Sequence, residues 1–173
     1  MWRSPPWVEL IQLAPVVSLA FPIIVRGEVD LPSMGGAFAG ATVLAVLVTA
    51  GLRWRGHTLN PILLGTAVWL ALGAVGFGAP VPQLASWLAE TQAFGLFAAA
   101  LGVGVVATVA SPAGYIGAAH PDPAWVRKWS LVLLAVTSLA VVQAWLFRHD
   151  VRLGGGLPFI LLNVTRRIVL VRG

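Results

Sequence analysis

Charged side chains recur at intervals along the chain and leave long apolar stretches between them. An α-helix needs about 20 predominantly apolar residues to cross the ~30 Å hydrocarbon core of a bilayer. Such stretches are separated by short segments that contain arginine, proline or glycine. They lie at residues 8–25, 33–52, 61–79, 91–110 and 123–147. The pattern predicts an all-α integral membrane protein with a bundle of five transmembrane helices.

Residues that favour helix starts refine these boundaries. Asn60–Pro61 and Asp122–Pro123 each combine a capping side chain with a proline suited to the first helical position. Ser33 is expected to cap the second helix in the same way. Two internal prolines in the first stretch predict a kink or a break there. Residues 83–90 are too few and too polar to span, and we expect them to lie along the membrane surface.

The C-terminal segment at residues 157–171 leaves two alternatives open. The chain between Arg152 and Arg166 would span roughly 20 Å as a helix, which is short for a crossing. Asn163, Arg166 and Arg167 would share one helix face, as in an amphipathic helix at the interface. The segment is therefore either an amphipathic helix or a short sixth membrane helix.

Composition and charge leave room for one polytopic membrane domain over residues 1–173. Only 10% of the residues are charged, and the mean hydropathy is +0.89. The net charge of +5 does not indicate nucleic-acid binding, because the basic residues lie beside the apolar stretches. We expect them to contact lipid headgroups. The predicted headgroup residues are Arg53, Arg55, Arg127, Lys128, Arg166 and Arg167.

The distribution of Lys and Arg predicts the orientation. With the N-terminus in the cytoplasm, the inner segments hold Arg3, Arg53, Arg55, Arg127 and Lys128. The outer segments then hold Arg26, Arg148 and Arg152, and a sixth crossing would add three arginines to the inner side. The positive-inside rule therefore favours a cytoplasmic N-terminus in a bacterial inner membrane.

Small residues at helical spacing predict sites of close helix contact. Gly36 and Gly40 form a GxxxG pair, and similar pairs recur near residue 100. Such ridges pack either against another helix of the same bundle or against another membrane protein. Most tryptophans lie near expected helix ends, whereas Trp69 lies in mid-helix and is expected to pack. The predicted packing or partner-facing residues are Gly36, Gly40, Gly95, Ala99, Gly102 and Trp69.

The residues that usually carry catalysis are missing or scattered. The chain has no cysteine, and its histidines (His57, His120 and His149) fall in expected loops or at helix ends. We therefore expect neither enzymatic activity nor a metal site. The sequence requires no cofactor, although a bound lipid or pigment is compatible with it.

Two functional hypotheses are compatible with the lack of recognisable catalytic residues. The first is a non-catalytic scaffold or accessory subunit of a respiratory, photosynthetic or cell-envelope complex, with lipids and other integral membrane proteins as partners. The alternative is a small transporter or channel for an uncharged or lipidic substrate, with a path lined by Gln12, Gln92, Gln143 and Thr137.

The stretch HPDPAWVRKWSLVLLAVTSLAVVQAWLF (residues 120–147) combines proline, tryptophan and basic residues before a long helix. It follows a proline-bearing first helix, a small-residue second helix, a basic loop, a third helix, a short surface piece and a fourth helix. In these features the chain resembles the bacterial intracellular septation (inner-membrane-spanning) family. The tail LGGGLPFILLNVTRR departs from that family's pattern. The resemblance implies a role in organising the cell envelope through protein partners, without catalytic residues.

Overall fold

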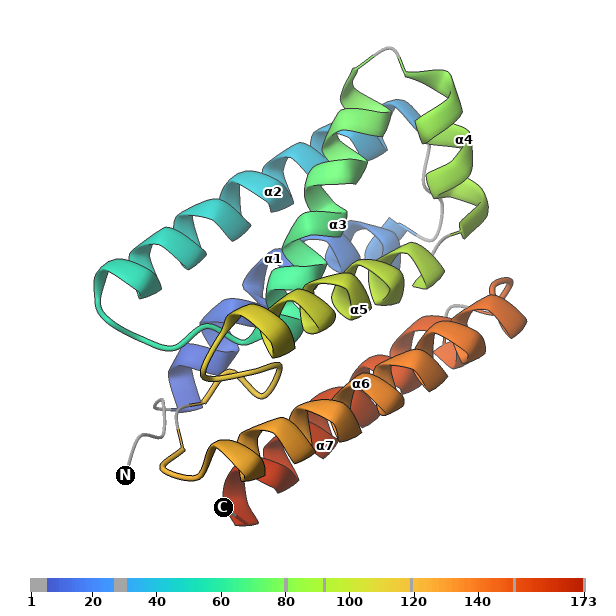
Figure 1. Ribbon diagram of the computed structural model, residues 1–173. Coiled ribbons are helices and arrows are strands. Elements are labelled where there is room, and N and C mark those ends of the chain that lie inside the picture. The colour runs from blue at the N-terminus through green and yellow to red at the C-terminus, as the bar shows by residue number, and fades with distance from the viewer. Residues whose placement is uncertain are drawn as a thin grey trace. The chain divides into compact units, whose positions relative to one another are not determined.

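The computed structural model describes residues 6–26, 31–79, 81–91, 93–118, 120–150 and 152–172. Side chains are described for these residues except 6, 9, 20–26, 31–33 and 172. The described part of the chain is helical and contains no strand, which confirms the all-α class (Figure 1). The α-helices are α1 (Pro6–Arg26), α2 (Leu31–Trp54), α3 (Pro61–Gly78), α4 (Pro82–Thr91), α5 (Ala93–Ala110), α6 (Pro123–Leu146) and α7 (Leu157–Arg172). A short π-helix, η1 (Arg152–Gly156), precedes α7.

The helix starts confirm two of the three predicted caps. The Asn60 side chain accepts a hydrogen bond from Ile62 N at 3.1 Å, and Asp122 accepts one from Ala124 N at 2.9 Å. Both predicted caps are thus confirmed. The prediction that Ser33 caps the second helix is wrong, because α2 already begins at Leu31. Proline is tolerated in a first helical turn, so Pro32 does not delay the start. Helix α1 also continues without a break through its two internal prolines, Pro15 and Pro22.

Among the described residues, five helices are long and apolar enough to cross a membrane. They are Met34–Trp54, Pro61–Gly78, Ala93–Ala110, Pro123–Leu146 and Arg152–Val171. The last one exceeds the expected C-terminal length because η1 runs directly into α7. In α1 the apolar part with described side chains is the shorter Leu10–Leu19. Several apolar helices are compatible with a multi-pass membrane protein.

The chain divides into two compact units. The N-terminal unit contains α1, α2, α4 and the part of α3 from Thr66 onward. Helices α1 and α2 contact each other, and Phe38 of α2 packs edge-on against Trp69 of α3 with ring centroids 4.9 Å apart. Gly73 admits the Phe38 ring, because a Cβ at this position would overlap it. Leu19, Ala41, Ala45 and Leu70 complete this core.

The C-terminal unit contains Asn60–Gly65 at the start of α3 together with α5, α6, η1 and α7. Helix α6 packs against both α5 and α7, and it lies alongside α7 (Figure 1). Gly65 of α3 approaches Ala100 of α5 so closely that a Cβ would collide with the backbone there. A single domain over residues 1–173 stays a prediction, since it depends on how the two units pack.

Many large apolar side chains on these helices are exposed. Val109 of α5 is 84% exposed, and Leu139 of α6 is 69% exposed. Contiguous exposed apolar surface on a soluble monomer is uncommon beyond a few hundred Å². Hydrocarbon around the helices would satisfy such side chains.

Candidate functional site

The most unusual feature of the C-terminal unit is a buried non-helical loop between α5 and α6. Residues 112–117 form consecutive turns, and Gly114, Tyr115, Ile116 and Gly117 are all buried. Gly114 has φ of +57° and Gly117 has φ of +69°, in the left-handed region that glycine adopts without steric cost. The two glycines therefore allow the chain to fold back on itself.

Three side chains from α6 and α7 anchor this loop. Ser130 Oγ accepts a hydrogen bond from Tyr115 N at 2.9 Å. The hydroxyls of Tyr115 and Thr137 lie 3.1 Å apart, and Thr137 also donates to Leu133 O. Arg166 Nε donates to Ile116 O at 2.9 Å. The loop backbone thus exchanges water for protein hydrogen-bond partners, as buried backbone requires.

Tyr115 is the central side chain of this arrangement. Its ring lies against Gly104 of α5, where a Cβ would be 2.7 Å from the ring carbon Cζ. Burial raises the pKa of Tyr115 to about 12, although the Thr137 hydrogen bond and the charge of Arg166 oppose the rise. The phenol is therefore neutral at physiological pH, and its hydroxyl contacts Thr137 of α6.

The structure gives Arg166 a different environment from the lipid headgroups that the sequence predicted. Its side chain is only 6% exposed and bonds to the loop, because α7 packs along α6 with this face inward. Asn163 donates to Phe159 O within its own helix. Arg167 is exposed, as a headgroup contact requires. Asn163, Arg166 and Arg167 share one helix face. Arg166 is buried on that face, whereas Arg167 is exposed.

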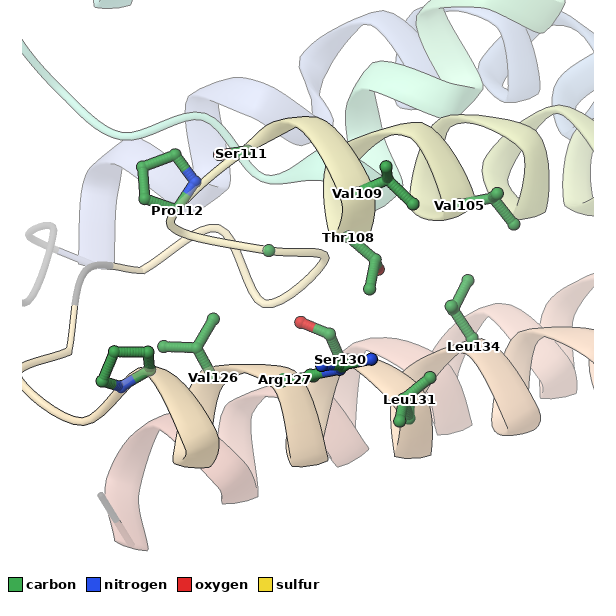
Figure 2. A pocket seen from close by; sticks show the side chains of 12 residues that line it. Val105, Thr108, Val109, Ser111, Pro112, Val126, Arg127, Ser130, Leu131 and Leu134 are labelled. Carbon is green, nitrogen blue, oxygen red and sulfur yellow. The ribbon is translucent and has the colours of Figure 1, made fainter.

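A groove lies beside the loop, between the C-terminal half of α5 and the N-terminal half of α6 (Figure 2). Its volume is about 540 Å³. Val105 and Val109 line it from α5, whereas Leu131 and Leu134 line it from α6. Pro112 and Gly114 of the loop line one end. The groove is therefore mostly apolar.

The polar groups of the groove are already satisfied, with one exception. Thr108 donates to Gly104 O, Ser111 Oγ accepts from Ala113 N, and Ser130 Oγ accepts from Tyr115 N. Arg127 lines the same groove and is exposed. No hydrogen bond or ion pair joins its side chain to another described residue.

The predicted small-residue sites occupy contrasting environments. A Cβ at Gly36, Gly40 or Gly102 would meet no described atom within 4 Å. Gly95 is buried and Ala99 is half-buried in α5. Close approaches between helices occur instead at other glycines, among them Gly35, Gly65 and Gly73, where an added Cβ would collide with a neighbouring helix.

The remaining predicted residues are placed as follows. Trp69 packs within the N-terminal unit, and its Nε1 is buried without a hydrogen-bond partner among the described residues. Arg53, Arg55, Arg127 and Lys128 are exposed near the ends of α2 and α6. Contact of these four side chains with headgroups stays a prediction.

The histidines and polar helix residues do not converge on a reactive centre. His57 meets Trp7 edge-on and His120 stacks on Trp125. In the part of the chain that the structure describes, no group of three His, Asp or Glu side chains could hold a metal ion. Gln143 donates to Leu153 O, and Gln92 lies outside the described residues.

The sequence carried a signal for the buried loop that spacing rules do not recognise. Tyr115 is the only tyrosine in the chain, and it is flanked by Gly114 and Gly117 in an otherwise apolar stretch. The partners of the loop lie 15 residues away for Tyr115 N and 50 residues away for Ile116 O, so a local sequence pattern does not show them.

The first prediction concerns the ionisation of Tyr115. In detergent-solubilised protein, the near-ultraviolet tyrosinate absorbance should rise near pH 12 instead of the usual value of about 10. Because the folded pKa is raised, this group's stabilisation is complete below about pH 10 and is lost as the pH rises through about 12. Tyr115→Phe should remove the transition. A midpoint near pH 10 in folded protein would contradict the burial of this ring.

The second prediction separates Arg166 from its neighbour. Arg166→Met leaves the buried Ile116 carbonyl without this donor and should lower the free energy of unfolding by about 2 kcal/mol. Arg167→Met is the matched control and should change it little, because Arg167 is exposed. Thermal unfolding in one detergent compares the two variants. Equal losses would show that the contact between Arg166 and the loop contributes nothing specific.

Neither protein-family models nor curated proteins nor solved structures show a match to this chain. The resemblance to the septation family accordingly stays a prediction. Functional inference depends on the geometry of the two units themselves.

Proposed function

We propose that the chain is a non-catalytic, multi-pass membrane protein that serves as a scaffold or accessory subunit of a larger membrane complex. The observation that carries this proposal is an exposed ridge on α2 whose two glycines have no described atom against them. The ridge consists of Gly36, Gly40, Val43 and Leu47, which lie at the three- and four-residue spacing of one helix face and are exposed. We call these residues the open ridge.

A neighbouring glycine of α2 lies in close contact with another helix, in contrast to the glycines of the open ridge. Gly35 lies next to Gly36 but faces Phe77 of α3, where a Cβ would be 2.9 Å from the carbonyl oxygen. Gly36 and Gly40 meet no described atom at that range. In lipid, close backbone approach and packing drive helix association, and glycine permits that approach. One side of α2 is thus filled by its own chain, while the open ridge is suited to a helix of another subunit.

The hydrogen bonds of the polar side chains favour a scaffold role over transport. A transport path needs polar side chains free to contact the substrate. Thr137 and Gln143 are each engaged in internal hydrogen bonds, to Leu133 O and Leu153 O respectively. Gln12 also makes an interaction of its own. The transporter alternative therefore has less support than the scaffold.

The proposed location is a bacterial inner membrane with the N-terminus in the cytoplasm. In the C-terminal unit, the basic residues Arg127 and Lys128 lie near the start of α6, whereas Arg167 lies near the end of α7. Arg166 bonds to the loop that precedes α6, so these ends of the two helices lie together. The positive-inside rule assigns such an end to the cytoplasm. A respiratory, photosynthetic or cell-envelope assembly would supply the partner.

The third prediction tests the open ridge. Gly36→Ile and Gly40→Ile should abolish association with the partner helix, because branched side chains prevent close backbone approach. The free energy of unfolding should not fall, since the ridge is open and isoleucine favours the helix more than glycine does. Co-purification in mild detergent with mass spectrometry measures association, and thermal unfolding measures stability.

Gly102→Ile on α5 is the matched control, because Gly102 is also exposed and open but lies in the other unit. It should leave co-purification through α2 intact. If the ridge variants retain every partner of the wild-type chain, the proposed scaffold role of α2 is wrong.

The fourth prediction tests orientation. The chain has no cysteine, so single cysteines introduced by Pro121→Cys and His149→Cys report the two ends of α6 separately. In intact cells a membrane-impermeant maleimide should label the position-149 variant and reach position 121 only after permeabilisation. The reverse pattern would invert the proposed topology, and labelling of both would contradict a crossing by α6.

A further inference from the structure

We infer that the groove between α5 and α6 binds one acyl chain of an anionic phospholipid, with Arg127 contacting the lipid phosphate. This inference requires the membrane location but not the scaffold role, because the groove lies in the C-terminal unit and the open ridge in the N-terminal unit.

The walls of the groove suit an acyl chain. Val105, Val109, Leu131 and Leu134 line its sides, and the volume of about 540 Å³ is in the range of small-molecule sites. The hydroxyls of Thr108 and Ser130 are engaged elsewhere, as described above. An apolar ligand can therefore fill the groove without leaving these groups unpaired, whereas a polar ligand would find few partners along its length.

Arg127 is the one charged side chain among the residues that line the groove, and it lies beside Ser130 (Figure 2). Its neighbour Lys128 lies 5.7 Å from the centroid of the Trp129 ring and does not line the groove. Arg127 lines the groove and has no ion-pair partner among the described residues. A guanidinium matches the geometry of a phosphate better than an ammonium does. An anionic group is thus the complementary ligand at Arg127.

The charge and the apolar walls follow each other in the order expected of a lipid. Trp125 and Trp129 flank Arg127, and such aromatic residues sit at the headgroup level of membranes. Leu134 lies seven residues further along α6, roughly 10 Å deeper at 1.5 Å per residue. The headgroup would lie at Arg127 while the acyl chain follows the groove inward. The loop at Pro112 and Gly114 lines the end near the membrane surface.

The experiment uses the full chain with one cysteine in the groove and one control cysteine outside it. Thr108→Cys carries a fluorophore in the groove, and Leu139→Cys carries it on the exposed outer face of α6. Each protein is reconstituted in phosphatidylcholine vesicles with increasing fractions of a brominated lipid, which quenches fluorescence on contact. Phosphatidylglycerol and phosphatidylcholine with the same brominated acyl chains are compared.

At position 108 we expect saturable quenching with an apparent affinity about fivefold higher for the anionic lipid, the equivalent of roughly 1 kcal/mol per basic residue. At position 139 the two lipids should quench equally. Arg127→Gln should remove the preference at position 108, whereas Lys128→Gln should keep it. Excess inorganic phosphate should leave the preference unchanged, because the acyl chain supplies most of the contact.

Four other outcomes would each contradict the inference. Equal quenching by the two lipids at position 108 would overturn the proposed site. Equal effects of the Arg127 and Lys128 variants would show only diffuse attraction to the membrane surface. Protection of position 108 from both lipids would indicate a protein segment in the groove. Loss of the preference in phosphate would indicate a site for a free anion, and each of these three results also overturns the inference.

Discussion

Backbone amide and carbonyl groups that are removed from water need hydrogen-bond partners, and this constraint explains the arrangement of the C-terminal unit. Helices satisfy their own backbone, but the turns at residues 112–117 do not. Non-helical backbone within a membrane protein is tolerated where protein buries it and supplies partners. Ser130 and Arg166 supply two of those partners, from two different helices. The loop therefore holds α6 and α7 to the end of α5 by specific polar contacts as well as by apolar packing.

Other features of the unit follow from that loop. Gly104 must lack a side chain because the Tyr115 ring lies against it. Arg166 is buried and becomes an internal support, whereas its neighbour Arg167 is exposed. The loop also lines one end of the groove between α5 and α6, so the same turns that anchor the helices shape the proposed lipid site. Structure and proposed binding thus depend on one set of contacts.

Structural features that depend on residues close together in the chain were predicted from the sequence. Caps at Asn60 and Asp122 were recognised because the capping side chain and its amide are two residues apart. The cap at Ser33 was wrong because Pro32 is compatible with both a pre-helical and a first-turn position. A loop was expected after Pro112, but its burial was not predicted, because Arg166 and Ile116 are 50 residues apart and no periodicity connects them. Glycine spacing showed where helices can approach closely, but it could not distinguish the filled face at Gly35 from the open face at Gly36.

The central claim is that the loop between α5 and α6 is buried and hydrogen-bonded in the native protein. Amide hydrogen exchange, measured by mass spectrometry on the chain in lipid nanodiscs, tests it directly. Peptides that cover residues 112–117 should exchange as slowly as those from the middle of α6, because Tyr115 N bonds to Ser130 and the surrounding residues are buried. The same peptides from protein unfolded in denaturant serve as the fast reference. Exchange of the loop at that fast rate would contradict the account.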